Sequence, residues 1–156
     1  MQDTEVLQQL TEDVGTAQKL LELMDAEYLA LAERNLAGLE ALLTQKQALL
    51  ALLGQHSTLR SQALAKSKLS IDQNGLAAYA AASAVGPSIL EQAEQLDKAL
   101  EACRIANERN GQQIRANQGT VSSMLTLLQG SNQAPDLYDR RGGAAKSSYN
   151  RPLSQA

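Results

Sequence analysis

The sequence lacks tryptophan and phenylalanine, and it contains only one cysteine, one histidine, three prolines and four tyrosines. A single cysteine excludes an internal disulfide, and so few aromatic side chains exclude a base-stacking platform for nucleic acid. The formal net charge is -3, so the chain also lacks the positive field that attracts phosphates. We therefore expect no nucleic-acid partner.

Long apolar runs are missing as well. No uninterrupted run approaches the roughly 20 residues that a membrane span needs, and the N-terminus lacks the basic, apolar and small-residue order of a signal peptide. We expect a cytoplasmic protein that does not insert into a membrane.

What the chain has instead is helix-forming residues. It contains 27 leucines and 25 alanines but only four valines and four isoleucines. Because leucine and alanine favour helices and the scarce β-branched residues favour strands, the composition predicts an all-α fold.

The first helix is predicted from apolar residues that recur at alternating spacings of three and four. We expect it to begin near Asp3 or Thr4, which are good N-cap residues, and to end near Ala32. After that point the spacing of three and four residues is interrupted, and Asn35 is suited to cap a second helix. The residues of the first stripe are Leu7, Leu10, Val14, Ala17, Leu21, Met24, Tyr28 and Leu31.

The rest of the chain predicts a second, a short and a third long helix. The second fades around residues 66–70, turn-forming residues follow at 71–75, and residues 76–84 suit a short helix. Ser88 and Glu91 fit a capping box for the third long helix, which we expect to run to about Gln129. The fold class is thus an antiparallel bundle, or coiled coil, of three long helices with a short connecting helix over residues 1–130.

The third long helix is too long for its neighbours. At 1.5 Å per residue it measures about 60 Å, whereas the first helix measures about 45 Å. One end therefore cannot bury its apolar stripe within the bundle and is available to another protein. We expect this surface to include Asn110, Ile114, Asn117, Val121, Met124, Leu125 and Leu128.

Three asparagines interrupt the apolar stripe of this helix, namely Asn107, Asn110 and Asn117. In one interpretation they fix the register of a helix pair, as buried amides do in coiled coils. In the other, they bind the backbone of a partner. The sequence leaves both interpretations open.

The composition changes after Gly130. Residues 131–156 are rich in glycine, serine, asparagine and glutamine, and they carry four basic residues against two acidic ones. Such a segment has too little apolar surface to offset the entropy lost on ordering, so we expect a mobile tail. Apolar pairs within it, such as Leu137 with Tyr138, are typical of short recognition motifs.

The sequence offers little catalytic chemistry. Cys103 falls on an apolar stripe and is expected to be a small buried residue without an activating charge. His56 suggests a histidine phosphotransfer domain but lacks the lysine and small residue that follow the histidine there, so an exposed position is favoured. The acidic residues near Glu94 have no accompanying histidine, and we expect neither metal nor cofactor, and no enzymatic activity.

The order of these parts resembles the FlgN family. The resemblance rests on the leading heptad helix, on the restart Asn35-Leu36-Ala37-Gly38-Leu39-Glu40 with residues 46–53 behind it, on the helix end from Asn107 to Leu128, and on the basic, tyrosine-containing tail. It covers nearly the whole chain.

This resemblance implies a cytosolic export chaperone without nucleotide hydrolysis, which holds the hook-filament junction proteins FlgK and FlgL by a disordered terminal helix. It also implies that a tail tyrosine, followed four residues later by glycine, docks onto the export gate protein FlhA. Tyr138 and Gly142 have that spacing, with Leu137 adjacent, although Asp139, Arg140 and Arg141 replace the Gly-Pro-Asp of some members.

Two alternatives remain open. The first is a structural coiled-coil or adaptor protein that associates with itself through the third long helix; a weak homodimer is also compatible with the chaperone. The other is the phosphotransfer bundle suggested by His56.

Overall fold

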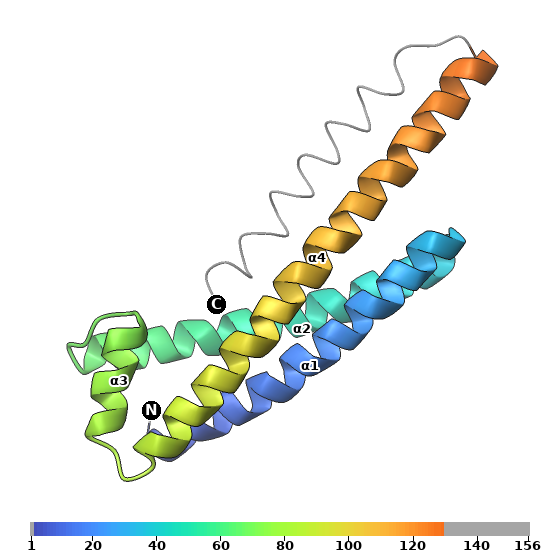
Figure 1. Ribbon diagram of the computed structural model, residues 1–156. Helices are drawn as coiled ribbons and strands as arrows, with labels where there is room; N and C mark the ends of the chain where they lie inside the picture. Colours follow the sequence, from blue (N-terminus) through green and yellow to red (C-terminus); the bar gives the residue numbers. More distant parts are fainter. Residues whose placement is uncertain (1, 130–156) are drawn as a thin grey trace.

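The computed structural model describes residues 2–129, with side chains as far as Gln118, and in this part of the chain every regular element is a helix (Figure 1). The all-α prediction is confirmed. The elements are α1 (Asp3–Glu33), α2 (Leu36–Lys66), α3 (Gln73–Ala81) and α4 (Gly86–Gln129).

Local capping explains where α1 ends and α2 begins. Arg34 adopts a left-handed conformation with φ of 57° and thereby ends α1. The Asn35 side chain then accepts a hydrogen bond of 3.0 Å from the backbone N–H of Gly38, so the predicted cap of α2 is confirmed. At the other end of α1 the cap is Gln2, whose backbone N–H donates to Glu5 at 2.8 Å, and the helix therefore starts at Asp3.

The short helix and the start of α4 differ from expectation. The Asp72 side chain accepts a hydrogen bond of 2.9 Å from Gly75 N–H, so α3 begins within the segment that we assigned to a turn. The capping box predicted at Ser88 is wrong because α4 already begins at Gly86, and Val85 C=O accepts from Ile89 N–H at 3.0 Å.

The long helices do not all run in opposite directions. Helix α2 is antiparallel to α1, as expected, but α4 runs parallel to α1, because α2 returns the chain to the end at which α1 begins and α3 turns it round again (Figure 1). The largest helix contact is between α1 and α4, and α2 packs against α1 and slightly against α3. The core cluster is formed by Val6, Leu10, Val14, Ala17, Leu20 and Met24 of α1, Leu53 of α2, Ala80 of α3, and Ile89, Leu96, Leu100, Cys103 and Ala106 of α4.

Two glycines should respond oppositely to alanine. A Cβ atom at Gly15 would meet nothing within 4 Å, whereas at Gly86 it would lie 1.9 Å from Ala80 O. Gly15→Ala should therefore raise the free energy of unfolding by about 0.5–1 kcal/mol, since alanine favours the helix. Gly86→Ala should lower it through the clash. Urea unfolding followed by circular dichroism checks both, and a shift of both variants in one direction would contradict this account.

Candidate functional site

Side chains of α4 donate hydrogen bonds to backbone carbonyls of α1 at regular intervals. We call this set the α1–α4 ladder; its rungs are Cys103 Sγ to Ala17 O at 3.3 Å, Asn110 Nδ2 to Met24 O at 2.7 Å, and Asn117 Nδ2 to Leu31 O at 3.1 Å. The donors are seven residues apart, and every rung joins residues separated by 86 positions. A constant separation means that the two helices run parallel in one fixed register.

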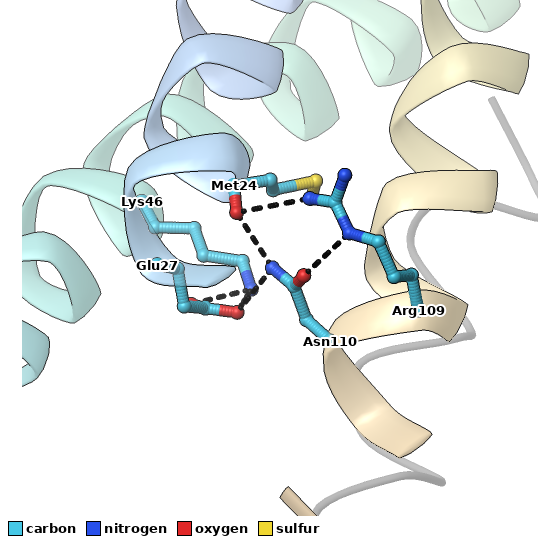
Figure 2. A network of polar contacts seen from close by, with 5 residues as sticks. All are labelled: Met24, Glu27, Lys46, Arg109 and Asn110. Carbon is cyan, nitrogen blue, oxygen red and sulfur yellow. Dashed lines mark hydrogen bonds and ion pairs between the residues drawn. The ribbon is translucent and has the colours of Figure 1, made fainter. Parts of the chain in front are cut away.

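The middle rung lies beside a buried charged network that joins three helices. Asn110 Nδ2 also donates to Glu27 Oε1 at 2.9 Å, and Lys46 Nζ of α2 lies 3.2 Å from Glu27 Oε2, as Figure 2 shows. Asn110 is 1% exposed and Lys46 is 2% exposed. A buried charge is tolerated only when it is paired and hydrogen-bonded, so this network requires α1, α2 and α4 to be in place together.

Arg109 closes the network on its solvent side. Its Nε donates to Asn110 Oδ1 at 3.1 Å, and its Nη2 donates weakly to Met24 O at 3.4 Å (Figure 2). The same Nη2 donates to Asp25 Oδ1 at 3.0 Å. The guanidinium also lies 4.4 Å from the centre of the Tyr28 ring, within the range of a cation–π contact. These contacts orient the Asn110 amide so that its NH₂ group faces α1.

The predicted interaction surface must therefore be corrected at Asn110. Its amide lies in the interior between α1 and α4, where it fixes register, and it is not available to another protein in this structure. Asn117 is half-buried and bonded to Leu31 O, which also favours the register interpretation, and Ile114 is half-buried. Val121, Met124, Leu125 and Leu128 lie on α4 beyond the described side chains, and Leu137, Tyr138 and Gly142 lie outside the described residues.

The expected length mismatch is present. Helix α4 has 44 residues and α1 has 31, and the last rung of the ladder joins Asn117 to a residue only two positions before the end of α1. We call residues 118–129 the α4 overhang; at 1.5 Å per residue it extends about 18 Å. Figure 1 shows α4 continuing past the end of α1, so its final turns have no neighbour among the described helices.

Helix α2 has one main neighbour. It packs almost entirely against α1, and Leu36 and Leu52 are 74% and 38% exposed. By length and composition alone α2 could cross a membrane, although polar residues interrupt its apolar residues. This is weak evidence, because single helices of soluble proteins meet the same criterion. Only 11% of this apolar stretch is buried, so most of it is accessible.

A second charged cluster connects α1 and α2. Asp13 is fully buried, and its two carboxylate oxygens lie 2.6 Å from His56 Nδ1 and 2.5 Å from Arg60 Nη1. The prediction of an exposed His56 is therefore wrong, since only 13% of its side chain is accessible. The histidine links the helices, and because so little of its side chain is accessible it is poorly placed to receive a phosphoryl group.

Sequence reasoning missed both charged clusters, although the sequence contains a signal for them. Asp13 and Glu27 are 14 residues apart on α1, and Lys46 and Arg60 are 14 residues apart on α2. The residue numbers add to 73 both for Glu27 with Lys46 and for Asp13 with Arg60, which is the pattern of two antiparallel helices in one register. Acidic and basic residues at equal spacings on consecutive helices thus predict the pairing.

The remaining chemistry is structural. Cys103 is buried as expected, and burial raises the pKa of its thiol to about 11, so it stays protonated and unreactive at neutral pH. Among the described residues no group of three or more His, Cys, Asp or Glu side chains could hold a metal ion. Glu94 forms an ion pair with Lys98, at 3.3 Å on the surface of α4.

These features define an all-α bundle built on a parallel α1–α4 pair, in which α4 is longer than α1 and, among the described helices, α2 packs mainly against α1. Within this class the chain belongs to the FlgN family, whose model, described as FlgN protein, matches residues 1–146. A solved structure described as a flagella synthesis protein FlgN, from Pseudomonas aeruginosa, is 37% identical with a TM-score of 0.69, over 83% of this chain and 99% of that chain. No curated protein matches the sequence.

Proposed function

We propose that this protein is a cytoplasmic export chaperone for flagellar assembly. It binds the aggregation-prone terminal helix of the junction proteins FlgK and FlgL and delivers them to the type III export gate. Membership of the FlgN family and the similarity to a flagella synthesis protein support this role. The observation that carries the proposal is the α4 overhang, a helix end that continues beyond its intramolecular partner.

The overhang is suited to an amphipathic helix. Helix α1 covers the inner stripe of α4 up to Asn117, which lies at the level of Leu31. Beyond that point the sequence continues the stripe with Val121, Met124, Leu125 and Leu128. A client helix that lies along these residues would occupy the position that α1 leaves empty, and its own apolar face would be shielded from aggregation. Binding needs neither nucleotide nor metal.

The tail serves a separate step in this proposal. Leu137, Tyr138 and Gly142 form the contact with FlhA, and the basic residues around them favour an acidic surface on the gate. Client and gate then bind to different parts of one chain, which allows a loaded chaperone to dock.

Deletion of residues 131–156 tests this division. The truncated protein should keep its helical circular dichroism spectrum and bind FlgK with an affinity within about threefold of the full chain, because a factor of three is under 1 kcal/mol. Binding to the cytoplasmic domain of FlhA and export of FlgK should be lost. The measurements are calorimetric titrations with each partner and an export assay in cells.

The control is the double variant Tyr138→Ala with Gly142→Ala, which keeps the full length and should lose only FlhA binding. If the full chain does not bind FlgK or FlgL, the proposed function is wrong. If the truncation alone abolishes client binding, the proposed division between overhang and tail is wrong.

A further inference from the structure

The outward face of α2 carries no charge over most of its length. Between residues 41 and 59 the only ionisable side chains are Lys46 and His56, and both turn inward to the carboxylates of Glu27 and Asp13 on α1. At 3.6 residues per turn the opposite side of the helix is centred on Ala48, Ala51 and Gln55, which are exposed. We call this the α2 outer face; its exposed members are Ala37, Ala41, Thr44, Ala48, Ala51, Leu52, Gln55, Thr58 and Gln62.

The exposed side of α4 has a different character. There Glu94 pairs with Lys98, and Arg104 pairs with both Glu101 and Glu108, so the surface has the alternating charges of a solvated helix. The difference within one molecule indicates that the α2 outer face is not shaped for water alone. Depletion of charge is also what distinguishes the centre of a protein interface from the remaining surface.

Opposite charges stand at the two ends of this neutral face. Glu40 and Lys66 are both exposed, and neither forms an ion pair within residues 2–129. Two helices that pair antiparallel by a two-fold axis at the level of residue 53 place position 40 of one against position 66 of the other. The same arrangement places Ala51 opposite Gln55 and Thr44 opposite Gln62.

We propose that the α2 outer face binds a second copy of this chain, forming an antiparallel α2–α2 pair with two symmetric Glu40–Lys66 ion pairs. Each copy has a net charge of -3, so a neutral centre permits an approach that a charged face would oppose. The charge order, acidic at one end and basic at the other, makes the face complementary to itself in the antiparallel direction only. A partner of one sign along its length lacks this fit.

The dimer should be weak and reversible. The paired stretch, residues 40–66, is about 39 Å long at 1.5 Å per residue, and one helix pair of this length with mostly alanine side chains lies at the small end of stable interfaces. Helix α2 packs mainly against α1 and makes no substantial contact with α4, the helix that carries the overhang. Dimerisation therefore leaves it open, and the inference does not rest on the proposed function.

Sedimentation equilibrium of the full chain over a wide concentration range tests the dimer. The wild type should show a reversible monomer–dimer equilibrium. Ala51→Glu places two carboxylates near the two-fold axis and should raise the dissociation constant at least tenfold. Gln95→Glu adds the same charge to an exposed site on α4 and should leave it unchanged. Circular dichroism confirms that each variant is folded.

A charge swap identifies the direction of pairing. Glu40→Lys and Lys66→Glu should each weaken the dimer several-fold, and the double variant should restore it, since the two ion pairs are then reversed. A monomeric wild type, a dimer that tolerates Ala51→Glu, or a double variant that fails to recover would each overturn the proposal. If the wild type is monomeric and Ala51→Glu weakens FlgK binding, the α2 outer face binds the client and not a second copy.

Discussion

Glu27→Ala should destabilise the protein by about 3–5 kcal/mol, one of the largest effects expected of any single substitution in the chain. The Lys46 ammonium, which is 2% exposed, would lose the carboxylate that faces it at 3.2 Å. The Asn110 amide would lose one of its two acceptors at the same time. A buried charge deprived of its counter-charge pays its desolvation cost in full, whereas an exposed pair contributes 1 kcal/mol or less.

A double substitution separates the cost of the unpaired charge from the cost of a lost side chain. Glu27→Leu combined with Lys46→Met removes both charges and keeps the volume, so the protein should recover most of its stability. Urea unfolding of the single and double variants, followed by circular dichroism, gives the coupling free energy directly. If the double variant were less stable than Glu27→Ala, the network would contribute more than charge compensation and this account would be wrong.

Asp13→Ala offers a comparison within the same helix pair. The basic groups that it would leave behind, His56 and Arg60, are 13% and 16% accessible and lie at the edge of the interface. They can turn toward water, so Asp13→Ala should lower the free energy of unfolding by less than Glu27→Ala does. The contrast tests whether burial of the remaining cation sets the cost.

The helix boundaries could be predicted because local signals specify them. The three-and-four spacing of leucines gives α1 and α2, and the side chain of Asn35 caps α2 as its position between two stripes indicates. The same local signals failed at Ser88, where the backbone begins the helix two residues earlier. A capping motif shows that a helix start is near, but the preceding turn decides at which residue the helix begins.

The direction and register of the helix pairs depend on contacts far apart in the sequence. An asparagine on an apolar stripe can bind a partner or a neighbouring backbone, and the α1–α4 ladder decides between these only because it places Asn110 against Met24 O. Likewise, the leucines of α2 predict a broad apolar face. Which part of that face stays exposed depends on α4 running along α1 and leaving α2 with one main neighbour.

The charged clusters show what a sequence can reveal when two helices are considered together. Singly, Glu27 and Lys46 have the composition of surface residues, and charged residues are rarely buried. Their common register with Asp13 and Arg60 becomes visible only when α1 and α2 are aligned antiparallel. The sequence thus predicted that α4 continues past its partner, but not that α1 accompanies it as far as Asn117.

Charged substitutions on the overhang should abolish client binding without unfolding the protein. Met124→Asp with Leu128→Asp removes two apolar side chains from the stripe that continues beyond α1. Each buried side chain of this size is worth about 1.5–3 kcal/mol, so the affinity for FlgK should fall at least about 100-fold. Because α1 ends two residues after Leu31, the acceptor of the Asn117 rung, the free energy of unfolding should change little.

The matched control is Ser122→Asp with Ser123→Asp, which adds the same two charges to the same turns but off the apolar stripe. It should bind FlgK with nearly unchanged affinity, as calorimetric titration would show. Equal loss in both double variants would mean that negative charge in this stretch is what the client rejects. Equal retention would move the client to another surface. Only a loss confined to Met124 and Leu128 agrees with a client helix that takes the place α1 leaves empty.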